Sequence, residues 1–338
     1  MKTRLPLHRE QFHATPGVLL QNEDFTVELF RYPAGIEAVR IHNRRGTVIV
    51  LPFYGQMIWQ ASFDGHSLTM GHSFKQPLPG SSIIDTYGCF AFHSGLLANG
   101  CPSAEDDHPL HGEMACARMD NAWIVLEEGR VSLEGETEYV KGFGHHYLAA
   151  PAVRLPANHA RLHIEMTVTN LAGAPMPLQY MCHLNSAWVE QGRFQQSIPD
   201  DAFQLRTTIP AHVRPTPAWR EYTERLARDP QSLQQLDQPQ MCDPEIVFFA
   251  DDLAQYGEQV QFELHSPQED YALMTRFSTA QFPHATRWLL HNLDQQVAAY
   301  ILPATCRPEG FLAAKQAGTL MELAPGEQRH FSVETGLL

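Results

Sequence analysis

Hydrophobic and polar residues alternate along most of this 338-residue chain. In the segment ARLHIEMTVTN, Leu162, Ile164, Met166 and Val168 alternate with polar residues, which is typical of a half-buried strand. Similar short segments recur, and Gly, Asn, Asp or Pro bounds most of them. They include FTVELFRY, IEAVRIHN, GTVIVLPF, MIWQASFDG, QVQFELH and HFSVETG. The pattern predicts an all-β antiparallel sandwich or barrel and does not fit alternating strands and helices.

One segment departs from this alternation. The spacing of Trp219, Tyr222 and Leu226 predicts a short amphipathic helix near 216–230, followed by a Gln-rich polar loop. We interpret residues 211–240 as a helix and loop insertion within the fold.

The length allows one large all-β domain or two smaller ones. Because no linker stands out, we expect a single domain over 1–338, with residues 1–25 as an N-terminal extension. The sequence contains no G-x-G-x-x-G, P-loop or G-x-S-x-G motif, so nucleotide binding and serine hydrolase chemistry have no positive support.

Composition narrows the class of partner. The net charge is -14 and no Lys/Arg run forms a basic patch, which disfavours nucleic acid, an anionic membrane surface and, more weakly, a phosphorylated substrate. The N-terminus has no apolar signal region, and no apolar stretch is long enough to span a bilayer, so we expect a cytoplasmic protein. The cysteines lack CxxC spacing and are expected to be reduced. They are Cys89, Cys101, Cys116, Cys182, Cys242 and Cys306.

Two histidine segments are the candidates for chemistry. HPLHGEMACARMDNAW contains His108, His111 and Glu113, and in an extended segment His111 and Glu113 would share a face. His108 alone is typical of a surface histidine, whereas the glycine after His111 permits close backbone approach.

The second segment is PLQYMCHLN, where His183 ends an apolar strand. Burial of an imidazole is costly unless its nitrogens are paired, so His183 is either a hydrogen-bonded core residue or a functional one. Asn185 shares its strand face and could contact the histidine or a ligand hydroxyl.

The order of PLHG, a TVTN strand closed by a Gly/Pro turn, YMCHLN and LAPGEQRHFSVETG resembles the galactose mutarotase-like superfamily of aldose 1-epimerases, and more narrowly one branch of it. The resemblance runs from about residue 45 to the C-terminus. It implies a large antiparallel β-sandwich with a sugar bound on a concave sheet face. It also implies that His111 and His183 point at the sugar ring oxygen.

Interconverting anomers requires a base that takes the C1 hydroxyl proton and an acid that protonates the ring oxygen. An imidazole suits the acid role, and His183 is the residue that we assign to it. The position that the resemblance implies for the base glutamate, in YILPATCRPEGF, is occupied by Leu302. The remaining candidates for the base are Glu309 in CRPEG and Glu113.

A sugar site also needs aromatic and hydrogen-bonding groups. Trp59, Trp188 and Trp288 are considered for stacking, and Trp288 is preferred because of its place in FPHATRWLLHN. The expected substrate-binding residues are His108, Glu113, Gln56, Asn99, Asn185, Asp243, Trp288 and Arg307.

Two alternatives to a mutarotase stay open. His108, His111, Glu113 and His183 could hold one divalent transition metal in a sugar isomerase or epimerase, although their spacing matches no strong metal signature. Otherwise a noncatalytic carbohydrate-binding or sensing protein would explain Leu302. The main expectation is a monomer or homodimer that acts on an unphosphorylated small-molecule sugar without a cofactor.

Overall fold

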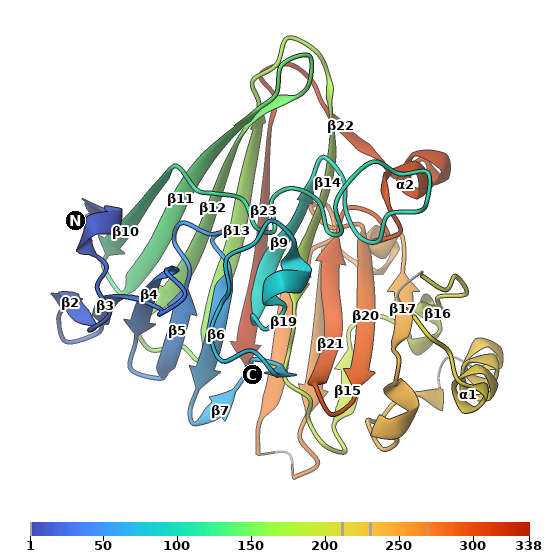
Figure 1. Cartoon of the computed structure of the whole chain (residues 1–338). Coiled ribbons are helices and arrows are strands. Elements are labelled where there is room, and N and C mark those ends of the chain that lie inside the picture. Colours follow the sequence, from blue (N-terminus) through green and yellow to red (C-terminus); the bar gives the residue numbers. More distant parts are fainter. Residues whose placement is uncertain (1, 211–212, 230–231, 269) are drawn as a thin grey trace.

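The strands of the chain assemble into two large antiparallel sheets (Figure 1). This computed structural model describes residues 2–210, 213–229, 232–268 and 270–338. The first sheet contains, in spatial order, β1 (Thr3–Pro6), β10 (Asn121–Glu127), β11 (Arg130–Val140), β12 (His146–Pro156), β13 (Arg161–Asn170), β23 (Gln328–Leu337), β19 (Ala272–Ser278), β18 (Gln259–His265) and β15 (Arg193–Gln196).

The second sheet carries the candidate site. Its spatial order is β16 (Phe203–Leu205), β17 (Ile246–Ala250), β20 (His284–His291), β21 (Gln295–Ala304), β14 (Met176–Leu184), β9 (Ala91–Leu96), β6 (Ile58–Phe63), β5 (Gly46–Val50), β4 (Glu37–His42), β3 (Thr26–Arg31) and β2 (Gly17–Gln21). The short strands β22 (Met321–Leu323), β7 (His66–Ser67) and β8 (Gly71–His72) pair with β14, β6 and β21.

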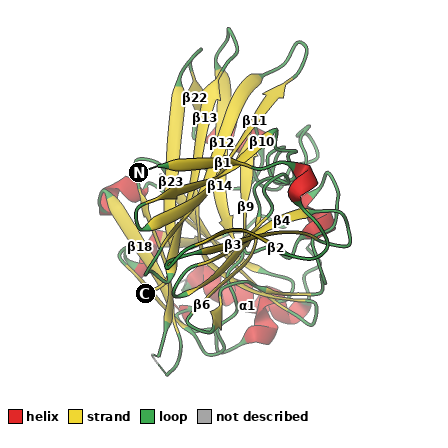
Figure 2. Ribbon diagram, turned by 90° about the vertical axis from the view of Figure 1, so that its left-hand side faces the viewer, coloured by secondary structure: helices red, strands yellow, loops and turns green. Residues whose placement is uncertain are grey.

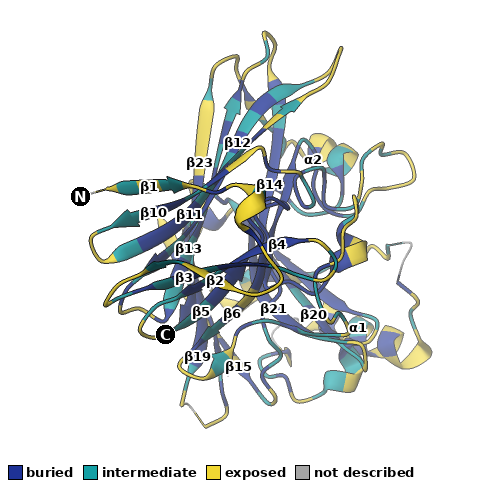
Figure 3. Ribbon diagram, turned by 60° about the vertical axis from the view of Figure 1, so that its left-hand side comes forward, coloured by how far each residue is buried: buried dark blue, intermediate teal, exposed yellow. Residues whose placement is uncertain are grey.

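Burial follows the alternation in the sequence. Along β13 buried and half-buried residues alternate at every position, so one face packs inward and the other meets solvent. In β14 nearly every residue is buried, because both faces of this central strand are covered. Figure 3 shows buried residues along the strands and exposed residues in the loops. The predicted all-β sandwich is confirmed.

Figure 2 shows the strands of the sheets from the side. Side-chain contacts between the sheets identify the inner face of each. Tyr180 of β14 packs against Phe331 of β23 with ring centroids 5.0 Å apart. Thr275 of β19 and Tyr300 of β21 are joined by a hydrogen bond of 2.8 Å between their hydroxyl groups. Because neighbouring residues of a strand point to opposite faces, His183, three residues after Tyr180, lies on the outer face of the second sheet.

The predicted helix is also confirmed, as α1 (Pro217–Arg228). Thr216 caps its first turn, accepting a hydrogen bond of 3.2 Å from the backbone N–H of Trp219. The expected stripe of Trp219, Tyr222 and Leu226 is buried. Positions 211–212 and 230–231 of the expected insertion lie outside the described residues.

Two features were not predicted. A short helix, α2 (Phe311–Ala317), begins after Gly310 and ends at Gly318. Residues 1–25 contain β1 and β2, which form an edge strand of the first and of the second sheet. Within the described residues no helix is long and apolar enough to cross a membrane.

A histidine on the inner face of the second sheet should make the free energy of unfolding depend on pH. His93 of β9 is buried there, Nδ1 lies 2.8 Å from the Tyr180 hydroxyl, and burial lowers the pKa of His93 to about 3. In the unfolded chain its pKa is about 6.5, so below that value the unfolded state binds a proton that the folded state does not. The contribution of neutral His93 to the free energy of unfolding is therefore complete above pH 6.5 and is lost as the pH falls towards 3.

We expect His93 to account for about 2 kcal/mol of lost unfolding free energy between pH 8 and pH 5. His93→Gln keeps a group that can accept the tyrosine hydrogen bond but does not titrate. Urea unfolding at both pH values should show a correspondingly smaller loss for the variant. An equal loss in both proteins would contradict this account.

Candidate functional site

The outer face of the second sheet is arranged by the pairing of β9 with β14. In this register His183 is opposite Phe92, and Met181 is opposite Ser94. Antiparallel partners share a face, so Phe92, Ser94 and His183 lie together on the outer side. His93 points to the inner side with Tyr180, as described above. The first five residues of the segment FHSGLLANG, 92–96, therefore belong to β9.

His111 reaches this face from the loop that follows β9. Its backbone N–H donates to the Gly100 carbonyl and its carbonyl accepts from the Gly95 N–H, each at 3.0 Å. His111 and Gly112 both have positive φ angles, 60° and 75°. A side chain at Gly112 would collide with the carbonyls of Ala98 and Gly95, so the predicted need for close backbone approach is confirmed.

The same geometry corrects one expectation. His111 and Glu113 do not share a face of an extended segment, because residues 110–116 form turns. The two left-handed residues, His111 and Gly112, rotate the chain between the side chains. His111 is directed to His183, and the two rings lie 4.8 Å apart at 86°.

Three aromatic side chains surround His183. Phe92 stacks on its ring at 4.4 Å, and Trp288 of β20 meets it edge to face at 5.8 Å. The Tyr87 hydroxyl lies 3.3 Å from Nε2 of His183. Tyr87 and Phe92 were not recognised as site residues from the sequence. Tyr87 gave no signal, because it lies in an irregular segment, and Phe92 lies in a fully buried strand without polar alternation.

Burial controls the protonation of this pair. His183 is 3% exposed and His111 is 8% exposed. Loss of solvent lowers the pKa of His183 well below its ordinary value, and the neighbouring His111 lowers it further, while the Asn185 side chain acts in the opposite direction. Burial also raises the pKa of Tyr87 well above its ordinary value.

A carboxylate beside Trp288 was not predicted from the sequence. Glu245, at the start of β17, is buried, and its Oε2 accepts a hydrogen bond of 2.7 Å from Nε1 of Trp288. Its other oxygen forms an ion pair with Arg206. Trp219 of α1 donates to the Glu245 backbone carbonyl at 2.9 Å. The helix α1 thus contacts Glu245, the residue that holds the Trp288 side chain. In the sequence Glu245 follows the candidate Asp243 by two positions, and no pattern distinguished it.

The position of the expected base is a buried leucine. β14 pairs with β21 through Met181 and Ala304. The same antiparallel register, extended by two residues on each strand, places Leu302 opposite His183. Leu302 is 1% exposed. A glutamate here would lie beside the imidazole, and leucine offers only apolar surface.

Glu309, the alternative base, lies farther along the chain. Its backbone bridges to Gly100, the residue that accepts the His111 N–H. Its Oε1 accepts a hydrogen bond of 2.8 Å from the Thr208 hydroxyl. Glu309 is therefore attached to the loop that holds His111, with its carboxylate bonded to Thr208.

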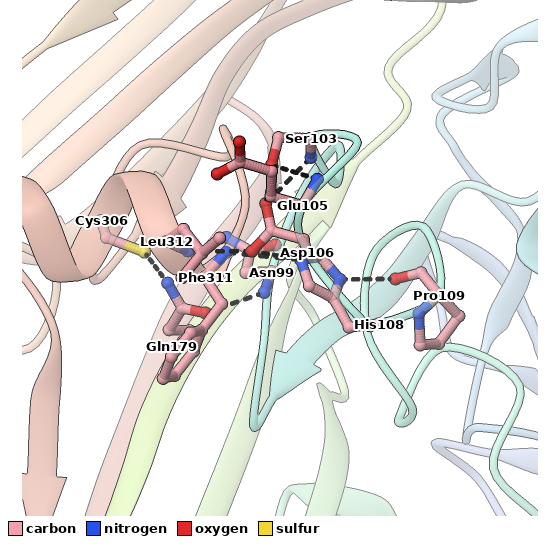
Figure 4. A network of polar contacts seen from close by, with 10 residues as sticks. All are labelled: Asn99, Ser103, Glu105, Asp106, His108, Pro109, Gln179, Cys306, Phe311 and Leu312. Carbon is pink, nitrogen blue, oxygen red and sulfur yellow. Dashed lines mark hydrogen bonds and ion pairs between the residues drawn. The ribbon is translucent and has the colours of Figure 1, made fainter.

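His108 has a different partner from the one expected (Figure 4). Its Nε2 accepts from the backbone N–H of Phe311 at 3.3 Å, and Nδ1 contacts the Pro109 carbonyl at 2.9 Å. Asp106 accepts from the N–H of Leu312 at 2.9 Å. These side chains satisfy the first N–H groups of α2, which otherwise have no partner in a helix. The structure thus gives His108 a helix-capping contact that the sequence did not predict.

Glu113 also holds the backbone. Its Oε1 accepts from the N–H groups of Leu96 and Leu97, both at 2.9 Å, and from the Tyr147 hydroxyl at 2.8 Å. The expected metal ligands His108 and Glu113 are thus engaged apart from the histidine pair. Among the residues with described positions, no three His, Cys, Asp or Glu side chains are grouped so that they could hold a metal ion.

Two of the expected amide residues lie close to the pair. Asn99 is linked to His111 through Ser94, whose hydroxyl donates to Oδ1 of Asn99 and lies 3.0 Å from Nδ1 of His111. Asn185 donates from Nδ2 to the Cys89 carbonyl at 3.0 Å.

Other expected contacts lie elsewhere. Gln56 is buried with Nε2 over Gly135 of β11. Arg307 forms an ion pair with Asp251 and stacks on Phe249. Asp243 is exposed and precedes a cis peptide bond to a proline. Trp59 is buried core, and Trp188 donates to Glu190 near the surface. None of these contacts is with His111 or His183.

Known structures share this architecture. A proposed aldose 1-epimerase from Klebsiella pneumoniae superimposes with a TM-score of 0.82 and 15% identity, over 100% of this chain and 92% of that chain. A galactose mutarotase-like protein from Clostridium acetobutylicum gives 0.63 and 13%, over 94% and 99%. A proposed aldose 1-epimerase from Escherichia coli K12 gives 0.55 and 16%, over 100% and 99%.

The chain therefore shares its fold with these three structures. It belongs to the family described as Domain of unknown function (DUF4432), whose profile matches residues 33–337. No curated protein matches the sequence.

The contacts of Glu113 predict a structural role that can be measured. Glu113→Ala leaves two backbone N–H groups and the Tyr147 hydroxyl without their acceptor, so the free energy of unfolding should fall by about 2 to 4 kcal/mol. Glu113→Gln keeps a carbonyl oxygen for the same bonds and should lose less than half as much. Denaturant unfolding monitored by tryptophan fluorescence measures both. Wild-type stability in Glu113→Ala would show that these bonds contribute nothing.

Proposed function

We propose that this protein is an aldose 1-epimerase-like enzyme that interconverts the anomers of an unphosphorylated sugar by opening and reclosing its ring. The observation that carries the proposal is the pair of imidazoles, His111 and His183, whose rings lie 4.8 Å apart on the outer face of the second sheet. The likeness of fold to proteins named as aldose 1-epimerases or mutarotase-like supports it.

The surroundings of the pair suit a sugar. Trp288 offers an aromatic surface, and aromatic side chains in sugar sites pack against the apolar face of a pyranose. The Tyr87 hydroxyl already occupies a hydrogen-bonding position at Nε2 of His183. In this proposal the sugar ring oxygen displaces the Tyr87 hydroxyl and takes over that position.

The charges favour a neutral sugar. Arg206 is paired with Glu245, and Arg307 with Asp251, so these two cations are already balanced by carboxylates. A phosphate group would have to compete with these ion pairs. The net charge of -14 also disfavours an anionic ligand.

The catalytic cycle moves one proton onto the ring oxygen and one off the C1 hydroxyl. We assign the first transfer to His183. Because its pKa is lowered, the protonated form is a minor species at neutral pH, but that form is a strong acid for the ring oxygen. When the ring recloses, the proton returns to His183 and C1 presents either face.

The assignment of His183 predicts a large loss of rate on removal of its proton. An asparagine in His183→Asn can replace one hydrogen bond of the imidazole but cannot deliver a proton. We expect anomer interconversion to fall about 100-fold to 10,000-fold, with the fold retained. Polarimetry on freshly dissolved aldoses, corrected for the spontaneous rate in the same buffer, measures this loss.

In the same assay, Glu309→Gln tests Glu309, the base candidate from the sequence. His93→Gln is the control, because His93 is a histidine on the opposite face of the same sheet. The control should keep the wild-type rate near pH 8. If wild type is active and His183→Asn is within threefold of it, His183 is a packed core residue. A wild-type protein that binds an aldose without accelerating its interconversion would favour the sensing function.

A further inference from the structure

The leucine at position 302 leaves the C1 hydroxyl without its expected carboxylate. A group that replaces this base must lie beside His183 and must present a nitrogen or oxygen lone pair. His111 meets the first condition, since its ring faces that of His183. Whether it meets the second depends on which ring nitrogen carries the proton in the neutral imidazole.

The contacts of Ser94 favour one tautomer of His111. Its Oγ has three polar neighbours, namely Oδ1 of Asn99, the backbone carbonyl of His111 at 3.4 Å, and Nδ1 of His111 at 3.0 Å. Two of them are carbonyl oxygens, which only accept hydrogen bonds. The single hydroxyl proton of Ser94 is therefore donated to an oxygen. The contact with Nδ1 can then be a hydrogen bond only if Nδ1 carries a proton and donates it to Oγ.

The backbone of Asn99 is held on both sides. It is fully buried, its backbone N–H donates to Oε1 of Gln179 at 3.1 Å, and its carbonyl accepts from the N–H of Gly310 at 3.2 Å. These bonds hold the Asn99 backbone in the loop, and its Oδ1 accepts the hydrogen bond from Ser94. The loop thus connects His111 to β14 and to the start of α2.

We infer that Ser94, oriented by Asn99, is a positioning residue that keeps the proton of neutral His111 on Nδ1, so that Nε2 takes the C1 hydroxyl proton in place of the missing glutamate. This inference rests on the proposed function. It explains why leucine at position 302 is compatible with catalysis, because the base has moved to the second imidazole of the pair.

The proton transfers balance between His111 and His183. The C1 hydroxyl proton passes to Nε2 of His111, and the electron pair of that O–H bond forms the C1 carbonyl. The bond between C1 and the ring oxygen breaks, and the ring oxygen takes the proton of His183. His111 is now an imidazolium whose Nδ1–H still donates to Ser94. Reclosure reverses each transfer, so no cofactor or co-reactant is consumed.

The test reads the tautomer directly. Nitrogen-15 NMR of histidine-labelled protein distinguishes a protonated ring nitrogen from an unprotonated one, and His111→Gln identifies the signals. We expect wild-type His111 to have Nδ1–H and an unprotonated Nε2 at pH 8. In Ser94→Ala a mixture of both tautomers should appear, whereas Ser94→Thr, which keeps the hydroxyl, should restore the wild-type signals.

Activity gives the second readout. Ser94→Ala should lower kcat at least 10-fold with KM within about threefold of wild type, because a misplaced proton affects the transition state and not ground-state binding. Ser94→Thr should recover most of the rate. Thr47→Ala is the matched control, since Thr47 has the same hydroxyl contact, 2.8 Å to Nδ1 of His42, outside the site. It should change neither the His111 signals nor the rate.

The outcomes separate the two proposals. An Nε2–H tautomer of neutral His111 in wild type, or an unchanged kcat in Ser94→Ala with the fold intact, would overturn the role of Ser94. If no aldose is interconverted by wild type but the NMR result is as expected, the proposed function fails, while the direction of the hydrogen-bond chain stands.

Discussion

The pairing register between β9 and β14 is the constraint on which the site depends. It places Phe92 and Ser94 beside His183 on the outer face, and sends His93 to the inner face with Tyr180. A shift of one residue would exchange the two sets, because side chains alternate along a strand. The large apolar side chains between the sheets oppose such a shift, so the packing of the core holds the chemistry in place.

The loop from β9 to β10 supplies the second half of the site. His111 enters through a left-handed turn, and its ring is held by Ser94 and faces His183. Glu113 secures the start of the same loop, and His108 secures its contact with α2. Two of the three polar residues that stood out in this segment, His108 and Glu113, thus maintain its conformation, and the third, His111, faces His183.

Much of the fold could be predicted from the sequence, because its determinants are local. The alternation in β13 and the apolar spacing of α1 each follow from one short segment. The convergence of His111 and His183 could be anticipated only through a family resemblance. The roles of His108 and Glu113 could not, since they depend on backbone N–H groups brought close by the fold. Glu245 was hidden because its partners, Arg206 and Trp288, are distant in sequence.

The central claim is that the paired imidazoles contact the ring of a sugar, and a crystal structure of the protein soaked with an aldose tests it most directly. The account predicts a sugar ring packed against Trp288, with its ring oxygen and C1 hydroxyl within hydrogen-bonding distance of His183 and His111. It also predicts that the Tyr87 hydroxyl is displaced from Nε2 of His183. A sugar bound elsewhere, with the His183 contact to Tyr87 unchanged, would contradict it.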